Sequence, residues 1–362
     1  MLINDIKHTT IKRTGTVARA LICVFLLMPL WATGALAQTD GGPYEQARAV
    51  YSEGDYSKAA ELFAAIAQND TLDLERRKEA LRYLGRAYVA QSLMDEARKA
   101  VADLLDLEPP LVELDPDMEP PTLINLYLEE RQKKSGGFAV ATEDPGVRTL
   151  AVMDFRNYAF DDAERWDNMQ WGFSSMMIEQ LSGATDLKLV ERENLKYLLD
   201  ELDLQNSGRV DQATAVRMGK MLGAHAMVFG GIIVSGRTMT LSARVVKVET
   251  SEILLGESVE GKAKDFYSLV EQLSLKVARS VNSALTDTEI GARTETRSLD
   301  AMQAYAAGLK LAEDGQYHAA YEKYMEALDR DPDYAKARRR AEGLVPILAA
   351  LTNPTGLDTG SE

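Results

Sequence analysis

The 362-residue chain has one cysteine, Cys23, and three histidines. Cys23 lies in an apolar stretch that we expect to be removed with a signal peptide, so the mature chain has no cysteine for a disulfide, a thiolate metal site or a nucleophile. Beyond that stretch only His225 and His318 remain, and neither has a second histidine at metal-ligand spacing. We expect both to be structural, and we expect no metal and no cofactor.

Positive charge is scarce as well. The 41 Lys and Arg residues face 56 Asp and Glu residues, which gives a net charge of -15. Because a phosphate backbone repels a chain of this sign, the composition argues against a general nucleic-acid-binding protein. After residue 37 no apolar run reaches the ~20 residues that a membrane-spanning helix needs.

The first 37 residues have the order of a secretory signal. A basic stretch from Lys7 to Arg19 precedes an apolar stretch from Ala20 to Trp31, and Ala35-Leu36-Ala37 places small residues at −3 and −1 of a cleavage site. This order predicts that residues 1–37 are a signal peptide and that the mature chain begins at Gln38. We therefore expect a protein that works outside the cytoplasm, in the periplasm.

Two other interpretations of this segment stay open. A membrane anchor is disfavoured because Pro29 interrupts the apolar stretch, which is also short for a bilayer. A lipid on Cys23 is disfavoured because more apolar residues, Val24 to Leu27, follow the cysteine and the bulky Ile22 precedes it.

Three later segments share a pattern of small and aromatic residues. It is most complete from Ala301 to Tyr334, it recurs from Leu81 to Pro109, and it is looser from Ala47 to Ile66. Small residues recur in a first helix, a turn follows, and the two fuller segments end on a proline, which cannot continue a helix. The pattern predicts pairs of antiparallel helices.

In such a pair, small residues let the two helices approach each other. We expect alanines at the crossings and glycines where the first helix meets its partner: Ala59, Ala97, Ala320, Gly85 and Gly308. These segments resemble tetratricopeptide repeats, whose period is about 34 residues. The alternative is a set of unrelated amphipathic hairpins that only bury a core.

Residues 148–286 have a different period. Short apolar runs at 149–155 and 187–192 predict buried strands, and runs at 227–234, 239–248 and 253–259 predict two consecutive hairpins. Helical patterns at 169–181, 194–204, 210–222 and 265–285 lie between or after them. The fold class is therefore α/β, a mixed (α+β) sheet with helices packed on it.

The central segment resembles the CsgG family. The resemblance is carried by Ala151-Val-Met-Asp-Phe155, by Val190-Glu191-Arg192-Glu193 with Leu195, and by Gly219, Leu222-Gly223-Ala224 and Gly230. That family includes the curli secretion channel of bacterial outer membranes and is similar in fold to LpoB, which activates a peptidoglycan synthase. The resemblance implies a central CsgG-like domain flanked by the helical pairs that resemble tetratricopeptide repeats.

The domains expected from these patterns cover most of the chain. They are a signal peptide at 1–37, a helical domain at 40–134 with a capping helix that starts at Pro120-Pro121, a linker at 135–147, the CsgG-like domain at 148–286, a C-terminal repeat with a solvating helix at 300–351, and a disordered tail at 352–362.

Pore formation is disfavoured on two grounds. Curli channels resemble one another in carrying a lipidated cysteine after the signal, and Gln38 stands there in this chain. A membrane-crossing strand needs ~9–11 residues with an apolar outward face, and every predicted strand already serves the domain's own sheet.

An enzyme is also disfavoured. The acidic residues from Asp154 to Glu164 lack the glycine and the spacing of a calcium loop, so we interpret them as a solvated acidic loop. Glu191 could serve as a general acid, but no nucleophile or base accompanies it in sequence.

We therefore expect a non-enzymatic adaptor or scaffold of the cell envelope that acts in assembly or export of envelope or curli-like extracellular components. Its partners would be envelope proteins or peptides bound in the grooves of the helical pairs. The residues expected to bind them are Arg48, Tyr51, Arg82 and Arg86. We also expect self-association through the central domain and peripheral contact with the outer membrane. Two alternative functions stay open: a regulator of a cell-wall synthase that resembles LpoB and, less favoured, a subunit of a secretion pore.

Overall fold

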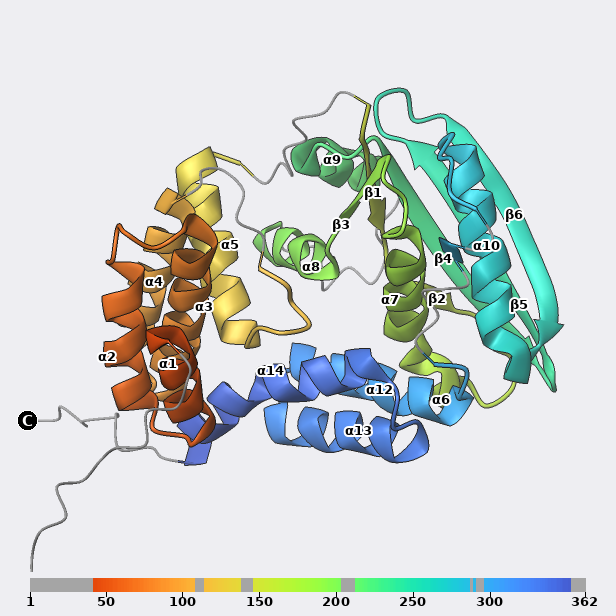
Figure 1. Ribbon diagram of the computed structural model, residues 1–362. Helices are drawn as coiled ribbons and strands as arrows, with labels where there is room; N and C mark the ends of the chain where they lie inside the picture. The colour runs from red at the N-terminus through yellow and green to blue at the C-terminus, as the bar shows by residue number, and fades with distance from the viewer. Residues whose placement is uncertain are drawn as a thin grey trace, which may run out of the picture. The chain divides into compact units, whose positions relative to one another are not determined.

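The computed structural model describes residues 42–107, 114–137, 146–202, 212–286, 289–290 and 296–352 (Figure 1). The expected signal peptide at 1–37 lies outside these residues, as do most of the expected linker and the tail beyond Thr352. The described residues from Gly42 onward belong to one compact unit.

Five helices form an N-terminal helical block: α1 (Pro43–Ser52), α2 (Tyr56–Ala67), α3 (Leu74–Ala90), α4 (Met94–Leu107) and α5 (Pro121–Ser135). Each packs on its neighbour in sequence. Asp55 and Asp73 begin α2 and α3, because their carboxylates accept hydrogen bonds from the backbone N–H of Lys58 and Arg76. The predicted helical pairs and the capping helix are therefore present; their assignment to the tetratricopeptide family stays a prediction.

The turns within the helical pairs need a left-handed backbone. Gly54 and Gly315 supply it with φ of 84° and 74°, as expected of a residue without a Cβ. The α3–α4 turn uses Ser92 instead, with φ of 60°. The α3–α4 turn therefore takes the left-handed conformation without a glycine.

One predicted glycine contact is confirmed and the other is wrong. A Cβ on Gly308 would lie 2.4 Å from the ring of Tyr324, so Gly308 does allow α12 (Leu299–Glu313) to approach its partner α13 (Tyr317–Arg330). A Cβ on Gly85 would instead meet Leu123 of α5 at 2.9 Å. Gly85 thus accommodates α5 rather than α4.

The sheet has six strands: β1 (Arg148–Val152), β2 (Arg156–Asn157), β3 (Leu187–Val190), β4 (Ala226–Ser235), β5 (Thr238–Lys247) and β6 (Ile253–Lys262). Its order is β3-β1-β4-β5-β6, and the short β2 pairs with β4 beyond the end of β1. β1 runs parallel to β3 and β4, whereas β5 is antiparallel to β4 and β6 is antiparallel to β5. The sheet is mixed, as the sequence predicts.

Helices cover both faces of the sheet. The helices of this part are α6 (Ala163–Asp167), α7 (Met169–Leu181), α8 (Arg192–Glu201), α9 (Gln212–Leu222) and α10 (Phe266–Ser280), which follows a 3-10 turn at Ala263–Asp265. α7 and α10 pack on one face, whereas α8 and α9 bury a second core on β1, β3 and β4 (Figure 1). The predicted helix at 169–181 coincides with α7.

The C-terminal helices join the two other parts. α12 packs on α13 and on α7 of the sheet segment. The last helix, α14 (Ala335–Thr352), packs on α13, on α3 and, less extensively, on α5 (Figure 1). The N-terminal block therefore meets the rest of the chain mainly through α14.

Candidate functional site

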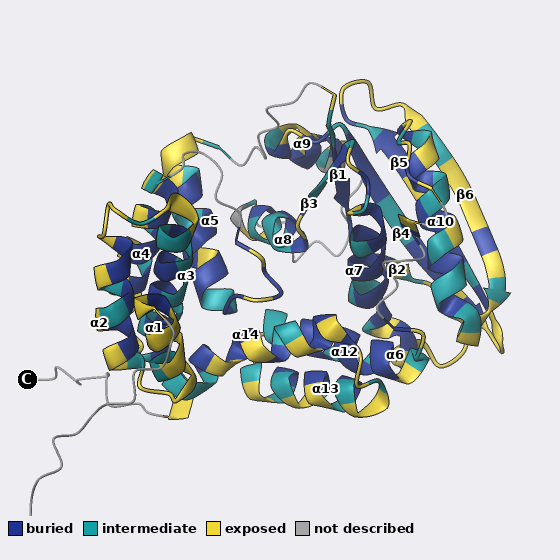
Figure 2. Ribbon diagram, in the orientation of Figure 1, coloured by how far each residue is buried: buried dark blue, intermediate teal, exposed yellow. Residues whose placement is uncertain are grey.

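Three of the four predicted partner-binding residues surround one ring, that of Tyr83 on α3. The guanidinium groups of Arg48 and Arg86 lie 5.6 and 4.7 Å from its centroid, and the ring of Tyr51 meets it edge-on at 5.2 Å. Arg48 is exposed and the other three are half-buried (Figure 2). Sequence periodicity could place these residues on α1 and α3, but Tyr83, which holds them together, was not singled out.

Tyr51 belongs to the core as much as to the surface. Its ring also meets those of Tyr56 and Phe63 at 5.2 and 6.5 Å. Burial is the main cause that raises the pKa of the Tyr51 hydroxyl above its ordinary value. The hydroxyl therefore stays protonated, and Tyr51 presents a neutral, largely apolar side chain.

Arg86 is already engaged within the chain. Its Nε and Nη2 each donate a 2.7 Å hydrogen bond to Glu119, whose side chain is 2% exposed. Such a two-point pair fixes the guanidinium plane. One helical turn earlier on α3, the buried Nε of Arg82 has no hydrogen-bond partner among the described residues. Arg48 and Arg82 are therefore more available than Arg86 to bind another molecule.

Next to Glu119, a cluster of buried charges ties three parts of the chain together. Asp117 faces three cations of α14: Arg340 at 2.6 Å, Lys336 at 3.5 Å and Arg339 at 3.7 Å. Burial opposes ionisation of Asp117, but these cations outweigh it and hold the pKa of the carboxyl below its ordinary value. Asp117 therefore stays charged and attracts α14 to the loop before α5.

Two helices of the sheet segment complete this cluster. Arg340 also donates to Glu193 of α8 at 2.9 Å, and Lys336 donates to Glu179 of α7 at 3.2 Å. Because Asp117 belongs to the N-terminal block, one network links that block, α14 and the sheet segment. Sequence reasoning missed it; the run Arg338-Arg339-Arg340 was the available signal.

Asp161, Asp162 and Glu164 are exposed, as the interpretation of a solvated acidic loop requires, whereas Asp154 is half-buried and paired. Arg192 approaches Asp154 at 2.9 and 3.3 Å, and Ser174 donates a 3.0 Å hydrogen bond to the same carboxylate. Arg192 also donates to Glu313 of α12 at 2.7 Å. Its guanidinium lies 6.0 Å from the Trp171 ring, and Lys310 lies 5.5 Å from that ring. Asp154 thus anchors the start of α8, and no three potential metal-ligating residues gather in the described parts of the chain.

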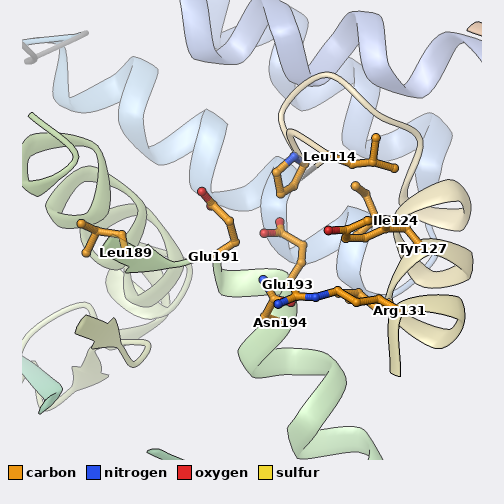
Figure 3. Close-up of a pocket in the computed structure, with 10 residues that line it drawn as sticks. Leu114, Ile124, Tyr127, Arg131, Leu189, Glu191, Glu193 and Asn194 are labelled. Carbon is orange, nitrogen blue, oxygen red and sulfur yellow. The ribbon is translucent and has the colours of Figure 1, made fainter. Parts of the chain in front are cut away.

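A recess lies where α5 meets the start of α8 (Figure 3). Its volume is only about 20 Å³, and a second recess that Glu193 also lines has about 90 Å³. Figure 3 shows Glu193 between Glu191 and the side chains of Tyr127 and Arg131 of α5. The contact of α5 with α8 therefore lies beside two small recesses.

Glu191 is the acid whose ionisation this recess changes most. The pKa of Glu191 is raised to about 8. The main cause is burial of its carboxyl group, although the residue as a whole is exposed at the recess; the second cause is the nearby charge of Glu193. Its proton is retained at neutral pH, and no ion pair to Glu191 is found in the described residues. A raised pKa is compatible with acid catalysis, but the recess brings no nucleophile beside it.

In the part of the chain that the structure describes, no helix is long and apolar enough to cross a membrane.

The family model described as "Curli production assembly/transport component CsgG" matches residues 139–237. The match begins before β1 and ends at the β4–β5 turn. It covers the residues that carry the resemblance in sequence. No curated protein matches the chain.

Several solved structures are similar to part of the chain. The C-terminal domain of LpoB from Escherichia coli is 16% identical, with a TM-score of 0.27, over 41% of this chain and 99% of that one. A dodecamer of a PelC variant from Paraburkholderia phytofirmans is 12% identical, with a TM-score of 0.26, over 39% and 95%. TolB from Acinetobacter baumannii is 11% identical, with a TM-score of 0.26, over 38% of this chain; the matched part is only 28% of TolB.

Proposed function

We propose that the chain is a non-enzymatic adaptor of the cell envelope, which acts outside the cytoplasm in the assembly or export of envelope or extracellular components. The observation that carries the proposal is the match of residues 139–237 to the family of curli assembly and transport components. A periplasmic location, with peripheral contact to the outer membrane, is part of the proposal and is supported by the signal-like order of residues 1–37.

The charged groups of the sheet segment support a structural rather than a catalytic role. The carboxylate of Asp154 is held by Arg192 and Ser174, and Glu193 is held by Arg340. Asp154 thus links α8 to α7, and Glu193 links α8 to α14. These contacts support a role for the two carboxylates in positioning helices.

The surfaces left for partners lie on the N-terminal block and on the sheet segment. Arg48 is exposed on α1, and the aromatic side chains of Tyr158 and Phe160, beside β4, are 53% and 81% exposed. Large exposed aromatic groups are enriched at protein interfaces. They support binding of an envelope partner by the block and self-association through the sheet segment.

Photo-crosslinking in intact cells tests this proposal. A photoreactive residue at position 48 should capture a defined envelope protein, and the crosslinked chain should begin at Gln38. The same residue in place of Glu61, which is exposed on α2, is the matched control and should capture much less. Crosslinks between copies of the chain report self-association. Recovery from the cytoplasm with Met1 retained, or equal capture at both positions, would contradict the proposal.

A further inference from the structure

The chain's own last helix covers part of the surface where the N-terminal block would bind a partner. In the block, α1 and α3 are the first helices of two successive pairs and α5 is the capping helix; α14 packs against α3 and α5. At Gly343 the backbone of α14 is close to the loop before α5: a Cβ there would lie 3.2 Å from the carbonyl carbon of Met118 and 3.4 Å from the carbonyl oxygens of Asp117 and Glu119. Glu119 is the residue that holds Arg86.

The face of α14 that meets the block is divided along its length. Its first turns are cationic, since Lys336, Arg339 and Arg340 converge on Asp117. Its later turns are aliphatic, with Leu344 and Ile347 buried at 2% and 6% exposure. Gly343 separates the two halves and permits the close approach. The surface of the block thus accepts a helix with cations first, a small residue at the crossing and aliphatic residues last.

The block is held to the rest of the chain by little besides α14. Among the described residues, α5 also contacts α8, and this contact is less extensive than that of α14 with α3. α14 keeps a second packing partner in α13. Separation of the block from α14 would therefore leave the C-terminal helices packed together and would uncover the α3–α5 surface.

We propose that the surface formed by α3, α5 and residues 114–120 is a binding site for a basic amphipathic helix of a partner protein, and that α14 occupies it as an internal competitor. The chemistry of the partner helix is that of α14. The identity of the partner depends on the proposed adaptor function, whereas the site itself is a property of the chain.

A labelled synthetic peptide of residues 333–352 is the probe, and its fluorescence anisotropy measures binding to the purified whole protein. Arg340→Glu places a carboxylate against Asp117 and Glu193, which repels the chain's own α14 but leaves the peptide unchanged. This variant should bind the peptide at least tenfold more tightly than the wild type. Arg338→Glu makes the same charge change at an exposed position of α14 and should bind as the wild type does.

A peptide that carries Arg340→Glu itself should bind the Arg340→Glu protein at least tenfold more weakly than the unchanged peptide. If circular dichroism shows that Arg340→Glu does not fold, Gly343→Leu serves instead, because its side chain collides with the backbone at Met118. Equal affinity of the wild type and the folded loosened variant, or no binding to the latter, would overturn the site. Loss of crosslinking in cells with peptide binding intact would reject the adaptor function and leave the site standing.

Discussion

Gly230 shows how one missing side chain shapes the middle of the sheet. A Cβ at this position of β4 would lie 2.3 Å from the ring of Phe155, which lies three residues beyond the end of β1 and is fully buried. The β4–β5 register is regular at Gly230, so the glycine makes room for an aromatic ring and not for a β-bulge.

We expect Gly230→Ala to destabilise the protein by about 1–3 kcal/mol, because the added methyl group must displace the Phe155 ring in a packed core. Urea denaturation followed by circular dichroism measures the change. Gly256→Ala is the matched control: it also lies within a strand, but its Cβ would meet no atom within 4 Å. Its effect should stay within about 0.5 kcal/mol. Similar losses for both variants would show that the packing of Phe155 does not explain the glycine.

β5 illustrates how an element can have two different faces. Met239, Leu241, Ala243 and Val245 are buried towards α10, as the alternating pattern predicts. On the other face Thr240 is half-buried, and its hydroxyl donates a 3.3 Å hydrogen bond to Glu260 of β6. The alternation of side chains along a strand makes these faces independent.

Leu241→Asp should therefore unfold the sheet segment at neutral pH, because it buries a carboxylate with no partner. Thr240→Lys is the neighbouring control and should fold, since its ammonium can pair with Glu260 across the strands. Near-ultraviolet circular dichroism and thermal melting distinguish the two. A folded Leu241→Asp protein would mean that this face of β5 is not the buried one.

The elements that the sequence predicted are those whose periodicity is long enough to recognise. The 13-residue α7 and the ten-residue strands β4 and β5 could be placed from their apolar pattern. The two-residue β2 and the five-residue α6 could not, because a periodic pattern is recognised only when it repeats several times. The contacts of Arg192 with Asp154 and Glu313 were likewise beyond prediction, since these residues are 38 and 121 positions away and belong to separate elements.

At the scale of the whole molecule, the charges around Asp117 connect parts that are distant in sequence. Asp117 precedes α5, Arg340 lies on α14, and Glu193 lies on α8. Two of the three side chains are 12% and 14% exposed, so loss of one partner would leave the others charged and poorly hydrated. The N-terminal block and the sheet segment should therefore unfold together.

Differential scanning calorimetry should show a single transition for the wild type. In Arg340→Glu the link to the N-terminal block is replaced by repulsion, and we expect either a second transition at lower temperature or a marked broadening. The exposed Arg338→Glu should keep one transition. Two well-separated transitions in the wild type would show that the block is stable independently of the cluster.

Two cations, Arg192 and Lys310, lie beside the indole ring of Trp171. Arg192 comes from α8 and Lys310 from α12, so the indole ring is close to cations from two different helices. The ion pair of Arg192 with Glu313 links the same two helices. Indole emission depends on the charges close to the ring. The chain has three tryptophans, and Trp166 is buried in a different environment. The fluorescence of Trp171 should therefore change when α8 separates from α12.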